Sequence, residues 1–183
     1  MSACCNCEAI DQHFDPARAA AELDTYTRRG PPNTTRLILE ILNELPLEPE
    51  SLLDIGAGVG ILHHELLGAG VRTAVHIEAA HAYLDAARAE STRRGHAGRV
   101  RFLDGDFLAL ARELDPADLV TMDRVVCCYR DFELLVRQSV AKARRYYAIS
   151  YPRDLWFVRA HTVWQKPQTT ARRQPVSHVR ASA

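Results

Sequence analysis

The stretch Ser51–Leu67, SLLDIGAGVGILHHELL, decides the fold of this chain. It opens with a short apolar run, Leu52–Ile55, of the length expected for a buried strand. Three alternating glycines follow the run, and an apolar-periodic helix begins at Ile61. A strand, a glycine turn and a helix in this order direct free backbone N–H groups and the positive end of a helix at a ligand. The stretch therefore predicts a ligand-binding turn.

The spacing of Gly56, Gly58 and Gly60 separates this turn from a dinucleotide-binding turn. A dinucleotide fingerprint reads G-x-G-x-x-G, and Ile61 stands where its third glycine belongs. The carboxylate of Asp54 would repel a pyrophosphate, and it suits a ligand with a cationic ammonium end. A tight strand–helix turn without a ligand is the alternative that the stretch alone leaves open.

Two further predicted strands end in acidic residues. The strand 73–77 is followed by Glu78, which lies 18 residues beyond Gly60. In a doubly wound fold an acid at about this distance accepts hydrogen bonds from ribose hydroxyls. The strand 99–103 runs into Asp104-Gly105-Asp106-Phe107. There a local turn closed by an aspartate side chain is the alternative to a ligand contact.

Strands and helices alternate along the chain. A fourth strand, Asp118–Asp123, and a fifth, Tyr146–Ser150, are predicted on either side of a helix, Phe132–Lys142. This alternation predicts an α/β fold with a Rossmann-like, doubly wound, mostly parallel sheet of about five strands. N-terminal helices precede the first strand: Asp15 and Pro16 start one that ends before Gly30, and Asn33 can cap the next.

The order of these elements predicts three segments. The expected boundaries are an N-terminal helical lid over residues 1–50, a Rossmann-like domain over 51–164 and a disordered basic tail over 165–183.

Length and composition fit a single domain in a reducing compartment. The chain has 183 residues, 47% of them hydrophobic, and no run is long and apolar enough to span a bilayer. The N-terminus shows no secretory signal, so the five cysteines do not suggest a disulfide framework. We therefore expect a cytoplasmic protein that does not bind a membrane.

Charge is unevenly distributed along the chain. The net charge is zero, but all acidic residues lie at or before Asp154, which leaves about −5 on the body and about +5 on the tail. A body of this sign is a poor partner for the phosphate backbone of a nucleic acid. We expect a small-molecule ligand instead.

Three motifs, together with the acid Glu78 after the second strand, resemble the class I S-adenosylmethionine (SAM)-dependent methyltransferases. They are LLDIGAGVG at 52–60, VRFLDGDF at 100–107 and DRVVCCY at 123–129, and the resemblance covers about residues 51–151. It implies SAM as the cofactor and transfer of its methyl group to an oxygen or nitrogen of a small molecule. The CCxC start, the TTR after the proline pair and the CCY stretch look like a bacterial subgroup named by analogy with magnesium-protoporphyrin O-methyltransferase.

The resemblance also assigns roles to residues. It places Asp106 as the acceptor from the adenine amino group and Phe107 as the cover over the ring. The cofactor-binding residues that it implies are Asp54, Gly56, Gly58, Gly60, Glu78, Ala79, Asp106 and Phe107. Residues at the end of the fourth strand should border the reacting methyl group, and the catalytic candidates there are Asp123, Arg124 and Tyr129. A local ion pair is the alternative for Asp123 and Arg124.

Several polar features carry weaker indications. Cys4, Cys5 and Cys7 could ligate a metal, but ordinary thiols are the simpler interpretation and we predict no metal site. Cys127 and Cys128 are either a reactive thiol pair or small packing groups. Residues around the break between the first two helices face the cofactor or form a solvated hinge; these are Tyr26, Arg28, Arg29 and Thr34.

The chain departs from the family at its C-terminal end. The family's sheet finishes with an antiparallel hairpin beside the fifth strand, whereas after Asp154 this sequence offers a helix-like segment, Leu155–Trp164, and a polar tail. The fifth strand would then be an unpaired edge, which proteins cover or avoid. From this departure we expect one of three situations: a truncated chain, a chain completed by a second copy or another partner, or a chain that has lost activity. A non-catalytic SAM-binding protein and, less favoured, a nicotinamide-dependent oxidoreductase are the alternatives to an active methyltransferase.

Overall fold

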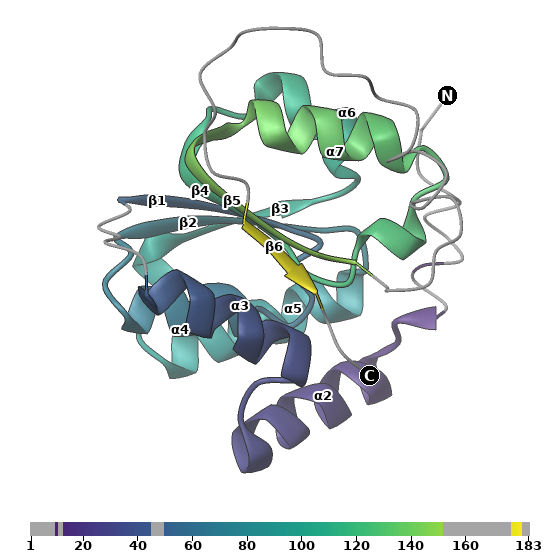
Figure 1. The fold of residues 1–183 in the computed structure, drawn as a ribbon. Helices are drawn as coiled ribbons and strands as arrows, with labels where there is room; N and C mark the ends of the chain where they lie inside the picture. The colour runs from purple at the N-terminus through teal and green to yellow at the C-terminus, as the bar shows by residue number, and fades with distance from the viewer. Residues whose placement is uncertain (1–9, 11–12, 45–49, 152–176, 181–183) are drawn as a thin grey trace, which may run out of the picture.

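A central parallel sheet with helices on both faces forms the core of the computed structural model (Figure 1), which describes residue 10 and residues 13–44, 50–151 and 177–180. Within these residues the strand order is β3-β2-β1-β4-β5-β6, and every neighbouring pair is parallel. The predicted α/β, Rossmann-like fold class is confirmed. The strands are β1 (Ser51–Ile55), β2 (Thr73–Glu78), β3 (Val100–Asp104), β4 (Ala117–Met122), β5 (Ala143–Tyr151) and β6 (Ser177–Arg180).

Helices cover both faces of the sheet. In Figure 1, α6 and α7 lie on one face, whereas α3, α4 and α5 lie on the other, with α2 beyond them. The helices are α2 (Pro16–Arg29), α3 (Asn33–Glu44), α4 (Ile61–Gly68), α5 (His81–Arg93), α6 (Phe107–Leu110) and α7 (Phe132–Ala141). Three short 3₁₀ turns complete the described helical segments: η1 (Ala97–Arg99), η2 (Ala111–Glu113) and η3 (Val126–Cys128). None of the described helices is long and apolar enough to cross a membrane.

The N-terminal helices begin largely where the sequence indicates. The Asp15 side chain accepts a hydrogen bond of 2.8 Å from the backbone N–H of Arg18, and Pro16 opens α2. Asn33 does not cap α3 as predicted. It lies inside the first turn, where its side-chain oxygen accepts from the Arg36 guanidinium at 2.9 Å.

The C-terminal end differs from the sequence-based expectation. Ser177–Arg180 forms β6, which pairs in parallel with β5 from Ala148 to Tyr151, so the predicted unpaired edge of β5 is covered. The prediction that the tail contains no strand is wrong for these four residues. A strand this short carries too little alternation to stand out in a polar tail, and the open edge of β5 supplies its pairing partner. The predicted helix Leu155–Trp164 lies outside the described residues.

The sheet is buried on both faces. Leu53 and Ile55 of β1 belong to a core cluster with residues of α7, whereas Leu52 belongs to a second cluster with residues of α3 and α4. Alternate side chains of a strand point to opposite faces, so β1 contributes to both clusters. Because the strands are parallel, the carboxyl ends of β1, β2 and β4 meet at one edge of the sheet, where loops can hold a ligand.

Candidate functional site

The glycine loop after β1 is held in a left-handed conformation. Gly56 and Gly58 both have φ of 60°, a region that side chains other than glycine rarely adopt. A Cβ at Gly56 would come within 2.5 Å of a Val125 methyl carbon. At Gly58 the nearest atom to such a Cβ is a Tyr83 ring carbon at 3.8 Å. The loop is thus closely packed at Gly56 and open at Gly58.

Glu78 at the end of β2 ties this loop to the next one. One carboxylate oxygen accepts from the backbone N–H of Gly58 at 2.8 Å, and the other accepts from those of Ala79 and Ala80 at 2.8 and 2.9 Å. Burial raises the pKa of Glu78, and the three N–H donors act in the opposite direction. The carboxylate therefore sits between two backbone turns, where it can also accept from a ligand.

A cavity of about 420 Å³ opens beside the loop. Its size lies within the range typical of sites for small molecules and cofactors. Most of the predicted site residues line it: Gly56, Gly58, Glu78, Ala79, Phe107, Asp123, Arg124 and Tyr129. The fold thus brings residues from four strand ends to one cavity.

Three of the predicted site residues, Asp54, Gly60 and Asp106, are not among the residues that line this cavity. Asp54 is 2% exposed, and its carboxylate accepts from the Thr121 hydroxyl at 2.7 Å. Its second oxygen lies 3.5 Å from Nδ1 of His63 and has no hydrogen-bond partner among the described residues. Asp54 lines a smaller cavity of about 40 Å³, which shares the glycine loop with the larger one. Gly60 precedes α4, and a Cβ there would meet the ring of His63.

Asp106 faces two structural partners. One carboxylate oxygen caps α6 by accepting from the backbone N–H of Leu108 at 3.1 Å, and it also accepts from the Tyr129 hydroxyl at 2.6 Å. The other oxygen is buried and has no hydrogen-bond partner among the described residues. An orphaned acceptor of this kind is costly to bury, which fits a donor supplied by a ligand.

Asp123 joins three elements at the end of β4. Its carboxylate accepts from the Thr35 hydroxyl of α3 at 2.5 Å and from the Ser150 hydroxyl of β5. The Nε of Arg124 lies 3.7 Å from the same carboxylate, so the local ion pair considered for these two residues is present. Asp123 is therefore well anchored before any ligand binds.

Arg124 has an unusual backbone conformation. Among the described non-glycine residues it alone has a positive φ, of 62°. Its backbone N–H donates to the Ser150 hydroxyl at 2.8 Å, and its guanidinium reaches Glu22 of α2 at 3.1 Å. A strained conformation of this kind persists only where surrounding contacts hold the residue in place, and such residues concentrate at functional sites.

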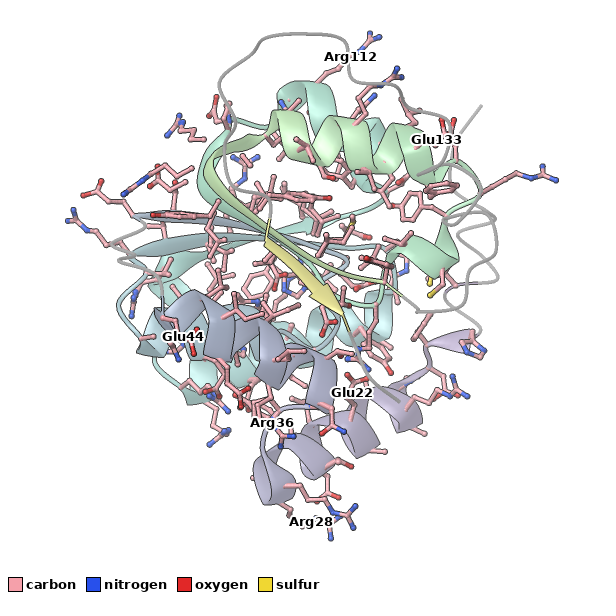
Figure 2. All side chains as sticks on the ribbon, viewed as in Figure 1. Glu22, Arg28, Arg36, Glu44, Arg112 and Glu133 are labelled. Carbon is pink, nitrogen blue, oxygen red and sulfur yellow. The ribbon has the colours of Figure 1, made fainter. Side chains whose placement is uncertain are left out.

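The sequence predicts an N-terminal helical lid, but sequence reasoning missed which residues of the N-terminal segment line the cavity. Ile10, His13, Phe14 and Glu22 line it together with Tyr83 of α5. In Figure 2, Glu22 lies on the side of α2 toward the sheet, whereas Arg28 points away from the molecule. Burial, reinforced by the Glu22 carboxylate, raises the pKa of Tyr83 to about 12, so this phenol stays protonated at neutral pH. In the sequence Glu22 is one polar residue on an amphipathic helix, and nothing distinguishes it.

The residues around the break between α2 and α3 divide between the cavity and other contacts. Thr34 contacts the carboxylate of Asp123 through its hydroxyl at 3.4 Å. Tyr26 instead donates to Glu65 of α4, and the Arg94 guanidinium lies 4.7 Å from the centre of its ring. Arg28 forms an exposed ion pair with Asp24. Of these residues, Thr34 lies nearest to a predicted catalytic group.

A family model decides the class of protein. The model of a family described as a methyltransferase domain matches residues 52–148 of this chain. This span contains the glycine loop, Glu78, Asp106 and the end of β4. The chain belongs to the methyltransferase-domain family.

Solved methyltransferase structures share this fold. A candidate SAM-dependent methyltransferase from Methanococcus maripaludis has a TM-score of 0.63 at 16% identity, over 82% of this chain and 71% of its own. A SAM-dependent methyltransferase from Thiobacillus denitrificans, solved with S-adenosylhomocysteine, has a TM-score of 0.54 at 16% identity, over 66% and 50%. An O-methyltransferase family protein from Burkholderia thailandensis has a TM-score of 0.60 at 19% identity, over 78% and 45%.

This chain spans only about half the length of the Thiobacillus and Burkholderia proteins. A search of curated proteins found no sequence match. At these identities the likeness concerns the fold alone. The subgroup named by analogy with magnesium-protoporphyrin O-methyltransferase stays a prediction.

Proposed function

We propose that this chain transfers the methyl group of SAM to an oxygen or nitrogen atom of a small molecule. Membership of the methyltransferase-domain family makes SAM the methyl donor. The observation that carries the proposal is a single cavity that joins the glycine loop, the Glu78 carboxylate and the end of β4. This arrangement suits a cofactor at one end and a methyl acceptor at the other.

The residues present fit the cofactor. The open space above Gly58 can take the methionine part, and the Glu78 carboxylate can accept from the ribose hydroxyls. Ala79 and Phe107 line the wall where the adenine would lie. Asp106 is buried directly behind this wall, between the lining residues Gly105 and Phe107, and its orphaned oxygen can accept from the adenine amino group if that group reaches it. Asp54 acts from beneath the loop, where its negative charge favours the cationic end of the cofactor.

The residues at the end of β4 would handle the acceptor. SAM supplies a methyl carbon bound to a sulfonium sulfur, which a lone pair can attack in line. The protein mainly positions the two groups and excludes water, effects that can lower a barrier by several kcal/mol. The two oxygens of Asp123 offer about four acceptor positions and accept from three hydroxyl groups, so Asp123 keeps capacity to hold or take the proton of an acceptor group. Arg124 can orient an acidic acceptor, and Tyr129 closes the wall beside it.

The alternative functions have lost part of their support. The absence of the family's two C-terminal strands favours a non-catalytic or partner-completed domain, but β6 pairs in parallel with β5 and covers that edge. A nicotinamide-dependent oxidoreductase requires a pyrophosphate on the glycine loop, where the buried carboxylate of Asp54 is unfavourable. Cytoplasmic location, the domain boundaries and self-association stay predictions.

Turnover with labelled SAM tests the proposal. The purified chain is incubated with methyl-labelled SAM and a panel of hydroxylated, amine and carboxylate acceptors, and S-adenosylhomocysteine is measured by mass spectrometry. We expect acceptor-dependent product, reduced at least tenfold in Asp123→Asn but not in the exposed control Asp115→Asn. Tight SAM binding without transfer to any acceptor class would overturn the catalytic proposal and favour a non-catalytic SAM-binding protein.

A further inference from the structure

An ion pair joins the N-terminal helix α2 to the turn after β4 at the wall of the cavity. A guanidinium nitrogen of Arg124 lies 3.1 Å from a carboxylate oxygen of Glu22. The side chain of Arg124 is 51% exposed and that of Glu22 is 25% exposed, so a ligand can reach both charged groups. The backbone of Arg124 is held in its positive-φ conformation by the hydrogen bond to Ser150. The two charges are therefore side by side before any ligand binds.

This ion pair lies where the large cavity adjoins the small one beneath the glycine loop. Five of the described residues line both cavities: Glu22, Gly56, Gly58, Asp123 and Arg124. Asp54 lines the small cavity, and one of its carboxylate oxygens is buried without a hydrogen-bond partner among the described residues. A space of about 40 Å³ accommodates one small polar group. A ligand in the large cavity can thus place one small charged group below the loop.

The small cavity favours a positively charged group. Among the described residues that line it, Glu22, Asp54 and Asp123 carry carboxylates, and Arg124 carries a guanidinium. The carboxylates outnumber the cation, so a further cation is attracted. The guanidinium, by contrast, is a preferred partner of a ligand carboxylate, because its planar N–H groups match two carboxylate oxygens.

A metal ion does not account for these carboxylates. Among the residues that the structure describes, no group of three or more histidine, cysteine or acidic side chains is arranged to hold one. The cysteines of the CCxC segment, Cys4, Cys5 and Cys7, lie outside the described residues. An ammonium group donates three hydrogen bonds and suits a set of carboxylate acceptors.

We infer that Glu22 and Arg124 recognise the amino-acid end of SAM. Arg124 binds its carboxylate, whereas Glu22 and Asp54 bind its ammonium group, which is attached to the same carbon atom. On binding, the internal ion pair is exchanged for two contacts with the ligand, so the cofactor joins α2 to the turn after β4. The inference rests on the proposed function. If Arg124 served the methyl acceptor alone, its removal would leave the affinity for the cofactor unchanged.

Calorimetric titration of the full chain with three ligands tests this inference. S-adenosylhomocysteine carries both charges, its decarboxylated amine analogue keeps only the ammonium group, and methylthioadenosine lacks both. The wild type should bind S-adenosylhomocysteine at least tenfold more tightly than either analogue. Arg124→Met should weaken S-adenosylhomocysteine at least tenfold but not the amine analogue. Glu22→Gln should weaken both of these ligands but not methylthioadenosine. The exposed changes Arg130→Met and Asp24→Asn are the controls and should bind all three ligands as the wild type does.

A charge exchange separates recognition of the ligand from support of α2. In Glu22→Arg/Arg124→Glu the ion pair can form again with its charges reversed. We expect the stability in urea to lie nearer to the wild type than in either single reversal, while S-adenosylhomocysteine binds at least tenfold more weakly than in the wild type. Wild-type affinity in the double variant would show that the ion pair only holds α2 in place, and would overturn the inference.

Two results of the titration would also contradict it. Equal affinity of Arg124→Met and the wild type for S-adenosylhomocysteine would remove Arg124 from the cofactor site. Equal losses for S-adenosylhomocysteine and methylthioadenosine would show that Arg124 does not recognise the amino-acid end. In both cases, binding of S-adenosylhomocysteine by the wild type would leave the proposed function standing. A wild type that binds none of the three ligands would overturn the proposed function together with this inference.

Discussion

At the scale of single residues, the candidate cofactor site depends on the contacts of the Glu78 carboxylate. Its carboxylate accepts from three backbone N–H groups of two turns, so it shapes the glycine loop as well as facing the cavity. A substitution there removes a ligand contact and an internal support at once. The test of its role must therefore separate binding from stability.

Removal of the Glu78 carboxylate should weaken binding of S-adenosylhomocysteine. We expect Glu78→Ala to weaken the free energy of binding by about 1–3 kcal/mol, because the ligand's buried donors would lose their hydrogen-bond acceptor. Isothermal titration gives the affinity, and urea unfolding gives the stability of the same sample. The exposed Glu113→Ala is the matched control. Equal affinity in Glu78→Ala and the wild type would remove Glu78 from the site.

Gly58 offers a sharper test of the same cavity. Its φ of 60° disfavours any β-branched residue, and a side chain there would enter the space proposed for the methionine part of the cofactor. Gly58→Val should abolish binding of S-adenosylhomocysteine in a titration. Gly98→Val is the control, because Gly98 has no close neighbour for a Cβ and lies away from the cavity. Wild-type affinity in Gly58→Val would refute the site assignment.

The sequence predicted some residues of the cavity better than others. Glycines and acids that follow strands were predictable, because the carboxyl ends of parallel strands meet at one edge. Glu22 and Tyr83 were not, because each sits on a helix whose rotation is fixed only by packing of α2 against α5. Asp54 was predicted as a ligand residue, but its burial beneath the loop with Thr121 and His63 depends on cross-strand neighbours.

At the scale of secondary-structure elements, α4 is enclosed more completely than its sequence suggests. His63 and His64 look like polar positions between apolar ones, yet they are 0% and 1% exposed. Nδ1 of His63 lies 3.3 Å from Nδ1 of His76 in β2, and Nδ1 of His64 lies 3.3 Å from Nδ1 of His96. A buried imidazole cluster of this kind tolerates positive charge poorly.

The histidine cluster should make the fold sensitive to acid. Burial, with His63 and Arg94 as further causes, lowers the pKa of His64 to about 3, and burial lowers that of His76 as well. A lowered folded-state pKa means that the unfolded chain takes up protons first, so the stability is present above pH 6.5 and is lost as the pH falls toward 3. For His64 alone, the free energy of unfolding should drop by about 2 kcal/mol from pH 7 to pH 5.

Urea unfolding at pH 7 and pH 5 measures this loss. The wild type should lose free energy of unfolding between pH 7 and pH 5, and in His64→Asn this loss should be smaller by about 2 kcal/mol. The difference does not depend on the variant's stability at pH 7. His13→Asn, an exposed change, should keep the wild-type pH dependence. The same pH dependence in His64→Asn and the wild type would show that His64 does not control acid sensitivity.

The β6 element makes a separate prediction about the sheet edge. Removal of residues 177–183 would leave the backbone groups of β5 unpaired, and such an edge recruits other chains. We expect this truncation to raise self-association in sedimentation velocity and to lower the melting temperature. Removal of residues 181–183 alone spares β6 and is the control. Identical sedimentation and melting of the two truncated chains would show that β6 does not protect the edge.

At the scale of the whole molecule, the fold was predictable because its signals repeat. The βα units repeat an apolar strand, a turn with glycine or an acid, and a helix, so errors in single elements do not change the topology. The pairing of β6 with β5 could not be predicted, because four residues in a polar tail carry no periodic pattern. The closure of the cavity by Ile10 and Phe14 likewise depends on long-range packing.

Calorimetric titration of the full chain with S-adenosylhomocysteine, with NADH as the competing ligand class, tests the central claim most directly. We predict binding of S-adenosylhomocysteine near micromolar, about −8 kcal/mol, and no heat with NADH. A folded, monodisperse sample that binds NADH, or that binds neither ligand, would contradict the assignment of the cavity beside Gly58 and Glu78 to SAM.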